Sequence, residues 1–133
     1  MSRASPVSTD RRITALLCEN SAWLAWLEAR EDAALAAVDA VRLPCTGTVE
    51  TVLLLRLLEQ GRRGVIVVGC PKDSCEYSRG SHRAEKRVAA ARAALRDAGL
   101  REDRIRMDFV SSVDGPRLAA VVRSFIEGLG ASP

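Results

Sequence analysis

Short continuous apolar runs alternate along the chain with longer segments in which apolar residues recur at helical spacing. The clearest run is Gly64–Gly69 (GVIVVG), whose β-branched residues are typical of a central parallel strand. Three more runs predict strands over residues 12–18 (RITALLC), 40–45 (AVRLPC) and 105–110 (IRMDFV). Pro44 closes the second of these, because proline cannot donate to a strand ladder. The pattern therefore predicts four strands.

Helices are predicted in the segments that follow each of these strands. Apolar residues at three- and four-residue spacing place them over residues 21–38, 49–60, 82–98 and 116–129. Residues 28–33 mark the place where the first of these helices could break. Ser21 and Thr48 are candidate N-caps, and Gly61 and Gly99 are candidate helix ends.

The predicted elements alternate in the order β-α-β-α-β-α-β-α. Such alternation predicts a parallel sheet with helices on both faces, because each parallel neighbour is reached through a crossover helix. We expect an α/β fold: a small doubly wound, flavodoxin-like parallel sheet of about four strands in the order 2-1-3-4. A single domain is expected over residues 12–130, preceded by a disordered N-terminal lead over residues 1–11.

Length, composition and charge narrow the class of protein. A chain of 133 residues with 47% hydrophobic and 28% charged residues is long enough for one core and ordinary for a globular protein. The net charge of +3 is too small to indicate a nucleic-acid partner, and 4% aromatic residues leave little for base stacking. No apolar run has the length of a membrane span, and the N-terminus lacks the apolar core of a secretory signal. A cytoplasmic location is expected.

Four cysteines are the most unusual chemical feature of the chain. Cys18, Cys45 and Cys70 each end a predicted strand or follow it directly, and Cys75 lies five residues beyond Cys70 in the same loop. The carboxyl ends of parallel strands meet at one edge of the sheet, where doubly wound folds bind their ligands, so we expect all four thiols at that edge. Thiolates are ligands of both zinc and iron–sulfur clusters, and both remain open on this evidence.

Other interpretations of the cysteines are also open. Each could be a small buried hydrophobic residue, and Cys70 could form a disulfide with Cys75, although a reducing cytoplasm disfavours a structural disulfide. These two could instead be a redox-active dithiol, but the Cys-x-x-x-x-Cys spacing differs from the Cys-x-x-Cys of thioredoxin-like enzymes. His82 could replace one thiolate as a ligand, or simply begin a helix. A single histidine argues against a hydrolase triad, and no Walker or dinucleotide-binding motif is present.

One stretch, GVIVVGCPKDSCEYSRGSHRAEKRVAAARAALRDAGL, has a specific pattern: an apolar strand, Gly-Cys, a short loop, a second cysteine, an aromatic residue, a small-residue turn and Ala-Glu-basic-Arg. The residues that form it are Gly69, Cys70, Cys75, Tyr77, Gly80, Ala84, Glu85, Lys86 and Arg87. This stretch resembles the delta subunit of the methyl-viologen-reducing hydrogenase, the iron–sulfur subunit that couples hydrogenase to heterodisulfide reductase. The loop LPCTG and the final segment IRMDFVSSVDGPRLAAVVRSFIEGL are also similar to that family, so the resemblance covers nearly all of residues 12–130.

The first cysteine loop departs from the hydrogenase-type members of this family. Those members have a cysteine-rich first loop, whereas here Cys18 is followed by Glu-Asn-Ser-Ala-Trp, which contains no further cysteine. This form is more similar to the version fused to the flavoprotein subunit of the quinone-interacting oxidoreductases of sulfate reducers. Hydrogenase should therefore not be assumed to be the electron donor.

The resemblance implies a non-catalytic electron-transfer subunit of an oxidoreductase complex. It implies that Cys18, Cys45, Cys70 and Cys75 hold a 2Fe–2S cluster, for which four thiolates suffice. Electrons would pass between a donor oxidoreductase, such as a hydrogenase or formate dehydrogenase, and a heterodisulfide-reductase-A-like flavoprotein in the cytoplasm. Nucleic acid and membrane insertion play no part in this interpretation. The alternative is a zinc-stabilised, non-redox adaptor module of a multisubunit complex.

Basic residues accompany the cysteines in the second half of the chain. Lys72 could raise the reduction potential of a nearby cluster through its charge, or could simply be exposed to solvent. Arg79, Arg83, Lys86 and Arg87 form a basic cluster that could steer an acidic partner toward this edge, or could be an ordinary exposed helix face.

Overall fold

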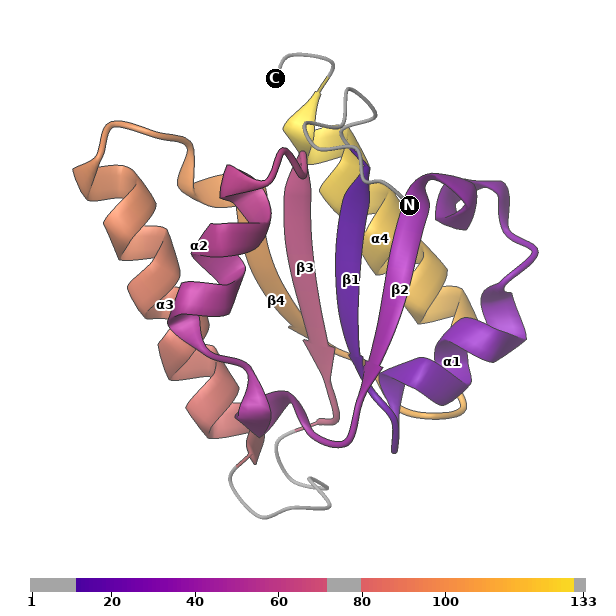
Figure 1. The fold of residues 1–133 in the computed structure, drawn as a ribbon. Coiled ribbons are helices and arrows are strands. Elements are labelled where there is room, and N and C mark those ends of the chain that lie inside the picture. The colour runs from indigo at the N-terminus through magenta and orange to yellow at the C-terminus, as the bar shows by residue number, and fades with distance from the viewer. Residues whose placement is uncertain (1–11, 72–79, 131–133) are drawn as a thin grey trace, which may run out of the picture.

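The computed structural model describes residues 12–71 and 80–130, which form one parallel sheet with helices on both faces (Figure 1). The strands are β1 Ile13–Cys18, β2 Val38–Leu43, β3 Gly64–Gly69 and β4 Ile105–Phe109. The α-helices are α1 Ala22–Ala29, α2 Thr51–Glu59, α3 Gly80–Asp97 and α4 Gly115–Leu129. Short 3-10 helices are η1 Ala33–Ala37, η2 Thr46–Thr48 and η4 Glu102–Arg104. The predicted lead over residues 1–11 lies outside the described residues.

The strands pair in the order β2-β1-β3-β4, and all three pairings are parallel. The predicted α/β class, the four-stranded parallel sheet and the strand order 2-1-3-4 are therefore confirmed. Every residue of β1 and β3 is buried, as expected for central parallel strands, whereas the edge strands β2 and β4 are partly exposed. All four strands point their carboxyl ends toward the same edge of the molecule (Figure 1).

Two apolar clusters, one on each face of the sheet, form the core. Helices α1 and α4 cover one face, where Phe125 is among the buried residues, and α2 and α3 cover the other, which includes Leu54. Successive residues of a strand point to opposite faces, so the neighbours Val67 and Val68 of β3 belong to different clusters. Helices on both faces confirm the predicted doubly wound arrangement.

The first predicted helix is shorter than expected. The prediction placed it over residues 21–38 with a possible break within residues 28–33, and α1 does end in that range, at Ala29. The separate helix η1 then follows. Asp32 explains the new start, because its carboxylate accepts a hydrogen bond from the backbone N–H of Ala34 at 2.9 Å and caps η1. Strand β2 then begins at Val38, two residues earlier than predicted, because Val38 pairs with the first residue of β1.

The start of α2 also differs from the prediction. Thr48 does not cap this helix, because it lies in η2 and its hydroxyl donates to the carbonyl oxygen of Cys45 at 2.7 Å. The helix therefore begins at Thr51 and not at residue 49. Other boundaries agree with the prediction within two residues: β2 ends at Leu43, α3 starts at Gly80 and β4 ends at Phe109.

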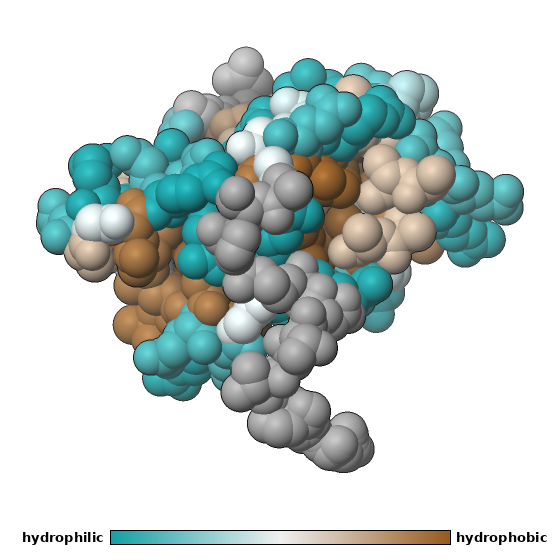
Figure 2. Space-filling model, turned by 90° about the horizontal axis from the view of Figure 1, so that it is seen from above, coloured by the Kyte–Doolittle hydropathy of each residue, from teal (hydrophilic) through white to brown (hydrophobic). Residues whose placement is uncertain are grey.

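The amino-terminal edge of the sheet is seen face-on in Figure 2, where hydrophilic residues cover most of the surface. An apolar patch lies on the side of α2 and α3, where Leu55, Leu58, Leu95 and Leu100 line a groove. This groove is at the opposite edge of the sheet from the strand ends that carry cysteines. Among residues 12–71 and 80–130, no helix is both long and apolar enough to span a bilayer.

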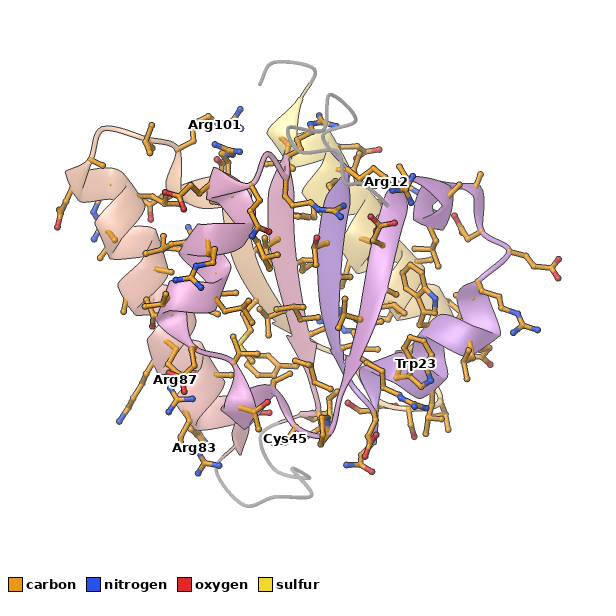
Figure 3. The ribbon with its side chains drawn as sticks, viewed as in Figure 1. Arg12, Trp23, Cys45, Arg83, Arg87 and Arg101 are labelled. Carbon is orange, nitrogen blue, oxygen red and sulfur yellow. The ribbon has the colours of Figure 1, made fainter. Side chains whose placement is uncertain are left out.

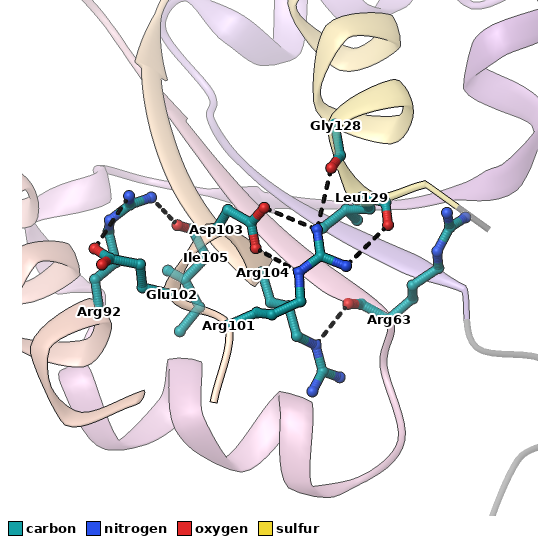
Figure 4. A network of polar contacts seen from close by, with 9 residues as sticks. All are labelled: Arg63, Arg92, Arg101, Glu102, Asp103, Arg104, Ile105, Gly128 and Leu129. Carbon is teal, nitrogen blue, oxygen red and sulfur yellow. Dashed lines mark hydrogen bonds and ion pairs between the residues drawn. The ribbon is translucent and has the colours of Figure 1, made fainter. Parts of the chain in front are cut away.

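Arginine side chains hold this amino-terminal edge together. Figure 3 shows Arg101 at this edge, and Figure 4 shows its contacts from close by. Its guanidinium donates to the backbone carbonyls of Gly128 and Leu129, both at 3.1 Å. Arg104 donates to the backbone carbonyl of Arg63 at 3.0 Å. These bonds tie the segment before β4 to the end of α4 and to the start of β3.

Gly64, the first residue of β3, lies where a side chain has no room. A Cβ atom there would lie 2.8 Å from Cδ1 of Leu129 and 2.9 Å from Cζ of Phe125, and both of these side chains are buried. We expect Gly64→Ala to lower the free energy of unfolding by about 1–3 kcal/mol, because α4 must shift away from the sheet. Denaturant unfolding of the purified proteins measures this change.

Gly128→Ala is the matched control for this substitution. A Cβ atom at Gly128 meets no other atom within 4 Å, and alanine favours a helix more than glycine does. We expect the free energy of unfolding to stay unchanged or to rise by up to about 1 kcal/mol. Equal destabilisation by the two substitutions would contradict the close approach of α4 to β3.

Asp39 of the edge strand β2 is held by two arginines. Its carboxylate accepts a hydrogen bond from Nε of Arg12 at 2.8 Å and another from Arg62. Partial burial raises the pKa of Asp39, but the hydrogen bonds from Arg62 and Arg12 and their positive charges outweigh burial. The net pKa of Asp39 therefore lies below its ordinary value of 3.8.

A carboxyl group with a lowered pKa stabilises the folded protein only while it is ionised. We therefore expect the free energy of unfolding to fall as the pH drops from about 5 through the folded pKa of Asp39. The part due to Asp39 is about 1 kcal/mol or less, because its side chain is 40% exposed and water screens both pairs. Urea denaturation between about pH 3 and pH 7 measures the effect. Asp39→Asn should flatten the acid limb, whereas the exposed control Asp97→Asn should not; an unflattened limb in Asp39→Asn argues against the pairing.

Candidate functional site

Three of the four cysteines lie at the carboxyl-terminal edge of the sheet, where the sequence predicts them. Cys18 is the last residue of β1, Cys45 lies between β2 and η2, and Cys70 directly follows β3. Their exposed fractions are 1%, 6% and 5%, so all three are buried. Cys75 lies outside the described residues, and its predicted place beside the others stays a prediction.

The turn after β2 places a hydrogen-bond donor on the sulfur of Cys45. The backbone N–H of Gly47 donates to this sulfur at 3.3 Å. The carbonyl oxygen of Cys45 accepts the hydroxyl of Thr48 at 2.7 Å, which closes the turn. An N–H donor stabilises the negative charge that a thiolate ligand carries, so the turn suits Cys45 as a ligand.

Cys70 is joined to the first turn of α3 through Ser81. The Ser81 hydroxyl donates to the carbonyl oxygen of Cys70 at 2.8 Å, and its oxygen lies 3.7 Å from the Cys70 sulfur. Gly69 leaves no space beside this contact, because a Cβ atom there would lie 3.0 Å from Oγ1 of Thr46 and 3.1 Å from Oγ of Ser81. The end of β3, the turn η2 and the start of α3 are therefore packed tightly together.

Arg87 of α3 holds the Cys45 turn in place. Its guanidinium donates to the backbone carbonyls of Gly47 at 2.7 Å and Val49 at 3.0 Å. The two contacts join α3 to a turn about forty residues earlier in the chain. The sequence pattern grouped Arg87 with a basic docking cluster and offered no signal of this structural role.

Two other residues of the predicted basic cluster on α3, Arg83 and Lys86, lie within the described part of the chain. Arg83 and Lys86 are exposed on α3, and Figure 3 shows Arg83 near the same edge as Cys45. Lys72 and Arg79 lie outside the described residues. His82, the alternative ligand, is exposed in the first turn of α3.

Cys18 ends β1 in a turn that is closed by Ser21. The backbone N–H of Ser21 donates to the carbonyl oxygen of Cys18 at 3.2 Å. Ser21 occupies the predicted N-cap position of α1, yet its side chain makes no capping hydrogen bond. It is 3% exposed, and its Oγ has no hydrogen-bond partner within the described residues. The sequence predicts a cap at this position but not a buried hydroxyl without a partner.

Buried hydroxyl groups are concentrated at the cysteine edge. The buried polar side chains of the described residues belong to Thr14, Ser21, Thr46 and Ser81. All except Thr14 lie within a turn of one of the three cysteines or in contact with it. Polar groups are costly to bury, so their concentration here indicates a requirement other than stability.

The donor chemistry at this edge fits a metal that prefers sulfur. Buried thiols suit zinc and iron–sulfur clusters and do not suit hard cations such as magnesium. Within residues 12–71 and 80–130, no three Cys, His, Asp or Glu side chains are gathered closely enough to form a metal site. The described residues therefore supply three candidate thiols at one edge, with Cys75 outside them.

Comparison with known proteins identifies the family. Residues 13–131 match the family model described as methyl-viologen-reducing hydrogenase, delta subunit. The iron-sulfur subunit of the vhu F420-non-reducing hydrogenase of Methanocaldococcus jannaschii is 38% identical over 101 residues, which are 74% of this chain and 75% of that protein. The iron-sulfur subunit of the F420-non-reducing hydrogenase of Archaeoglobus profundus is 34% identical over 88 residues, which are 66% of this chain and 64% of that protein.

A segment of a much larger protein is also similar. This protein is one of the subunits of the ferredoxin/F(420)H(2)-dependent CoB-CoM heterodisulfide reductase of Methanosarcina acetivorans. It is 29% identical over 92 residues, which are 69% of this chain but 12% of that protein. Similar sequence thus occurs both in separate subunits and within a larger polypeptide.

The match to the family model spans most of the sequence and confirms the resemblance seen in the motifs. The alignment with the subunit from Methanocaldococcus jannaschii covers more than two thirds of this chain. The chain belongs to the methyl-viologen-reducing hydrogenase delta subunit family.

Proposed function

We propose that the chain is an electron-transfer subunit that carries a 2Fe–2S cluster on Cys18, Cys45, Cys70 and Cys75. The observation that supports this most directly is the position of three buried cysteines at the same edge of the sheet, each at or just after the end of a different strand. Two relatives are named iron-sulfur subunits, and four thiolates are the number that a 2Fe–2S cluster binds. In this proposal the cluster domain spans residues 12–130.

The residues of the chain would hold and tune the bound group. When bound, a 2Fe–2S cluster accepts and releases one electron at a time. The Gly47 N–H on the Cys45 sulfur stabilises negative charge on that ligand. Arg87 fixes the turn that carries both groups, so the ligand is positioned before the cluster binds. Burial of the cysteines excludes water from their sulfur atoms.

The partners that we propose are a heterodisulfide-reductase-A-like flavoprotein and a donor oxidoreductase such as a hydrogenase or formate dehydrogenase, together in a cytoplasmic complex. The similarity to a segment of the larger heterodisulfide reductase polypeptide supports this, because in that protein a similar segment is part of the heterodisulfide reductase subunit itself. Here that domain would dock as a separate protein. The exposed charges of Arg83 and Lys86, on the helix that begins at the cysteine edge, would face acidic groups of the partner.

A zinc-stabilised adaptor is the second candidate function. The hydrogen bond from the Gly47 N–H to the Cys45 sulfur favours it equally, because structural zinc sites also use thiolates supported by such bonds. This candidate predicts zinc in the purified protein and no electron transfer. Metal analysis therefore separates the two.

We expect the protein to be brown when it is purified without oxygen from a host that assembles clusters, with about two irons per chain. Reduction with dithionite should give an S = 1/2 signal in low-temperature EPR. Each of Cys18→Ser, Cys45→Ser, Cys70→Ser and Cys75→Ser should lose most of the iron and the signal, because a ligand is removed. Ser124→Ala, on the exposed side of α4, is the control and should keep both.

Two other outcomes have different meanings. A colourless protein loaded with zinc from the same host contradicts the electron-transfer proposal and supports the adaptor. A metal-free protein with thiol–disulfide oxidoreductase activity supports dithiol chemistry instead, if that activity survives Cys18→Ser and Cys45→Ser but not the loss of Cys70 or Cys75.

Charge reversal on α3 tests the docking surface. We expect the double variant Arg83→Glu/Lys86→Glu to bind the heterodisulfide-reductase-A-like flavoprotein about tenfold more weakly at low ionic strength, with a smaller difference at high salt. Isothermal titration calorimetry at two salt concentrations measures this. Arg30→Glu, an exposed arginine at the end of α1, is the control. Equal weakening by Arg30→Glu would show that net charge, and not this helix, governs binding.

A further inference from the structure

Ser21 carries a buried hydroxyl for which the structure provides no use. Its Oγ is the buried side-chain polar atom that lacks a hydrogen-bond partner within residues 12–71 and 80–130. The residue is 3% exposed, so bulk water does not reach it. A buried hydroxyl without a hydrogen bond destabilises the folded protein, and each such group therefore requires an explanation.

Helix capping does not provide that explanation. Serine is among the best N-cap residues, and α1 begins directly after Ser21, but its side chain makes no capping bond. Other caps in the same chain do form. Asp114 accepts the backbone N–H of Arg117 at 3.1 Å at the start of α4, and Asp32 caps η1. The hydroxyl of Ser21 is therefore available to another partner.

The position of Ser21 indicates what that partner is. Its backbone N–H bonds to the carbonyl of Cys18, so the two residues close one turn at the cysteine edge. The sulfur atoms of the other two described cysteines already have polar neighbours: a backbone N–H at 3.3 Å for Cys45, and the Ser81 hydroxyl at 3.7 Å for Cys70. The Ser81 hydroxyl already donates its hydrogen bond to a backbone carbonyl, whereas the Ser21 hydroxyl has no hydrogen-bond partner within the described residues.

We propose that Ser21 is a positioning residue that donates its O–H to a sulfur atom of the bound cluster, an inference that rests on the proposed function. Reduction places more negative charge on the sulfur atoms, so this hydrogen bond is stronger in the reduced state. Ser21 therefore raises the reduction potential. A purely structural serine has a different signature: its loss would weaken the protein without the cluster and leave the potential unchanged.

Ser21→Ala tests the inference in the full chain, prepared without oxygen and with its cluster. We expect the potential to shift downward in an EPR-monitored redox titration, so that the ratio of oxidised to reduced cluster at the wild-type midpoint rises about tenfold. After removal of the cluster, the variant should unfold at the same or a higher denaturant concentration than the wild type, because it loses only an unpaired hydroxyl. Ser21→Thr keeps the O–H and should restore the potential.

The control Ser124→Ala, exposed on α4, should change neither quantity. A Ser21→Ala potential equal to those of the wild type and Ser124→Ala would overturn the inference. Loss of the cluster from Ser21→Ala but not from Ser21→Thr, with unchanged stability of the cluster-free protein, supports the same contact. A wild-type protein that holds no iron overturns the proposed function itself, so the two failures are distinguishable.

Discussion

The in-register parallel pairing of β1 with β2 and β3 is the constraint on which the cysteine edge depends. In this register Cys18 pairs with Leu43, the last residue of β2. Cys45 and Cys70 then follow within two residues of the ends of the neighbouring strands. A slip of one residue would turn every side chain of β1 toward the other face of the sheet. Ala15 and Leu17 of β1 pack in one core cluster and Leu16 packs in the other, so a slip would exchange side chains of different size between two close-packed faces. This packing fixes the register and so the positions of the three thiols.

Arginine side chains stabilise the two edges of the sheet. Arg101 and Arg104 donate to backbone carbonyls at the amino-terminal edge, and Arg87 donates to backbone carbonyls of the Cys45 turn at the other. A guanidinium suits this role because it presents several donors in one plane. Arg83 and Lys86 differ from these arginines, because both side chains are exposed on the helix that begins at the cysteine edge.

The four strands and the placement of three cysteines could be predicted because they follow from local patterns, namely apolar runs and the residues that end them. The strand order followed from the alternation of strands and helices, which favours a doubly wound sheet. The break after Ala29 lies within residues 28–33, where the sequence allowed one. The separate helix η1 and the late start of α2 could not be predicted, because they depend on side-chain hydrogen bonds of Asp32 and Thr48. The role of Arg87 depends on a contact with a turn far away in the sequence, which no local pattern encodes. The position of Cys75 stays a prediction.

The cysteine edge departs from rules that the rest of the chain follows. Asp114 caps its helix and the two faces of the sheet are covered by apolar side chains, whereas Ser21 caps nothing and buries a hydroxyl without a partner among the described residues. Local conflicts of this kind are expected where a sequence serves function as well as folding. A group that binds at this edge and accepts a hydrogen bond from the Ser21 hydroxyl removes the conflict. By linkage, its binding also stabilises the folded chain. If the proposed cluster is that group, a variant that weakens the turn between β1 and α1 also weakens cluster binding.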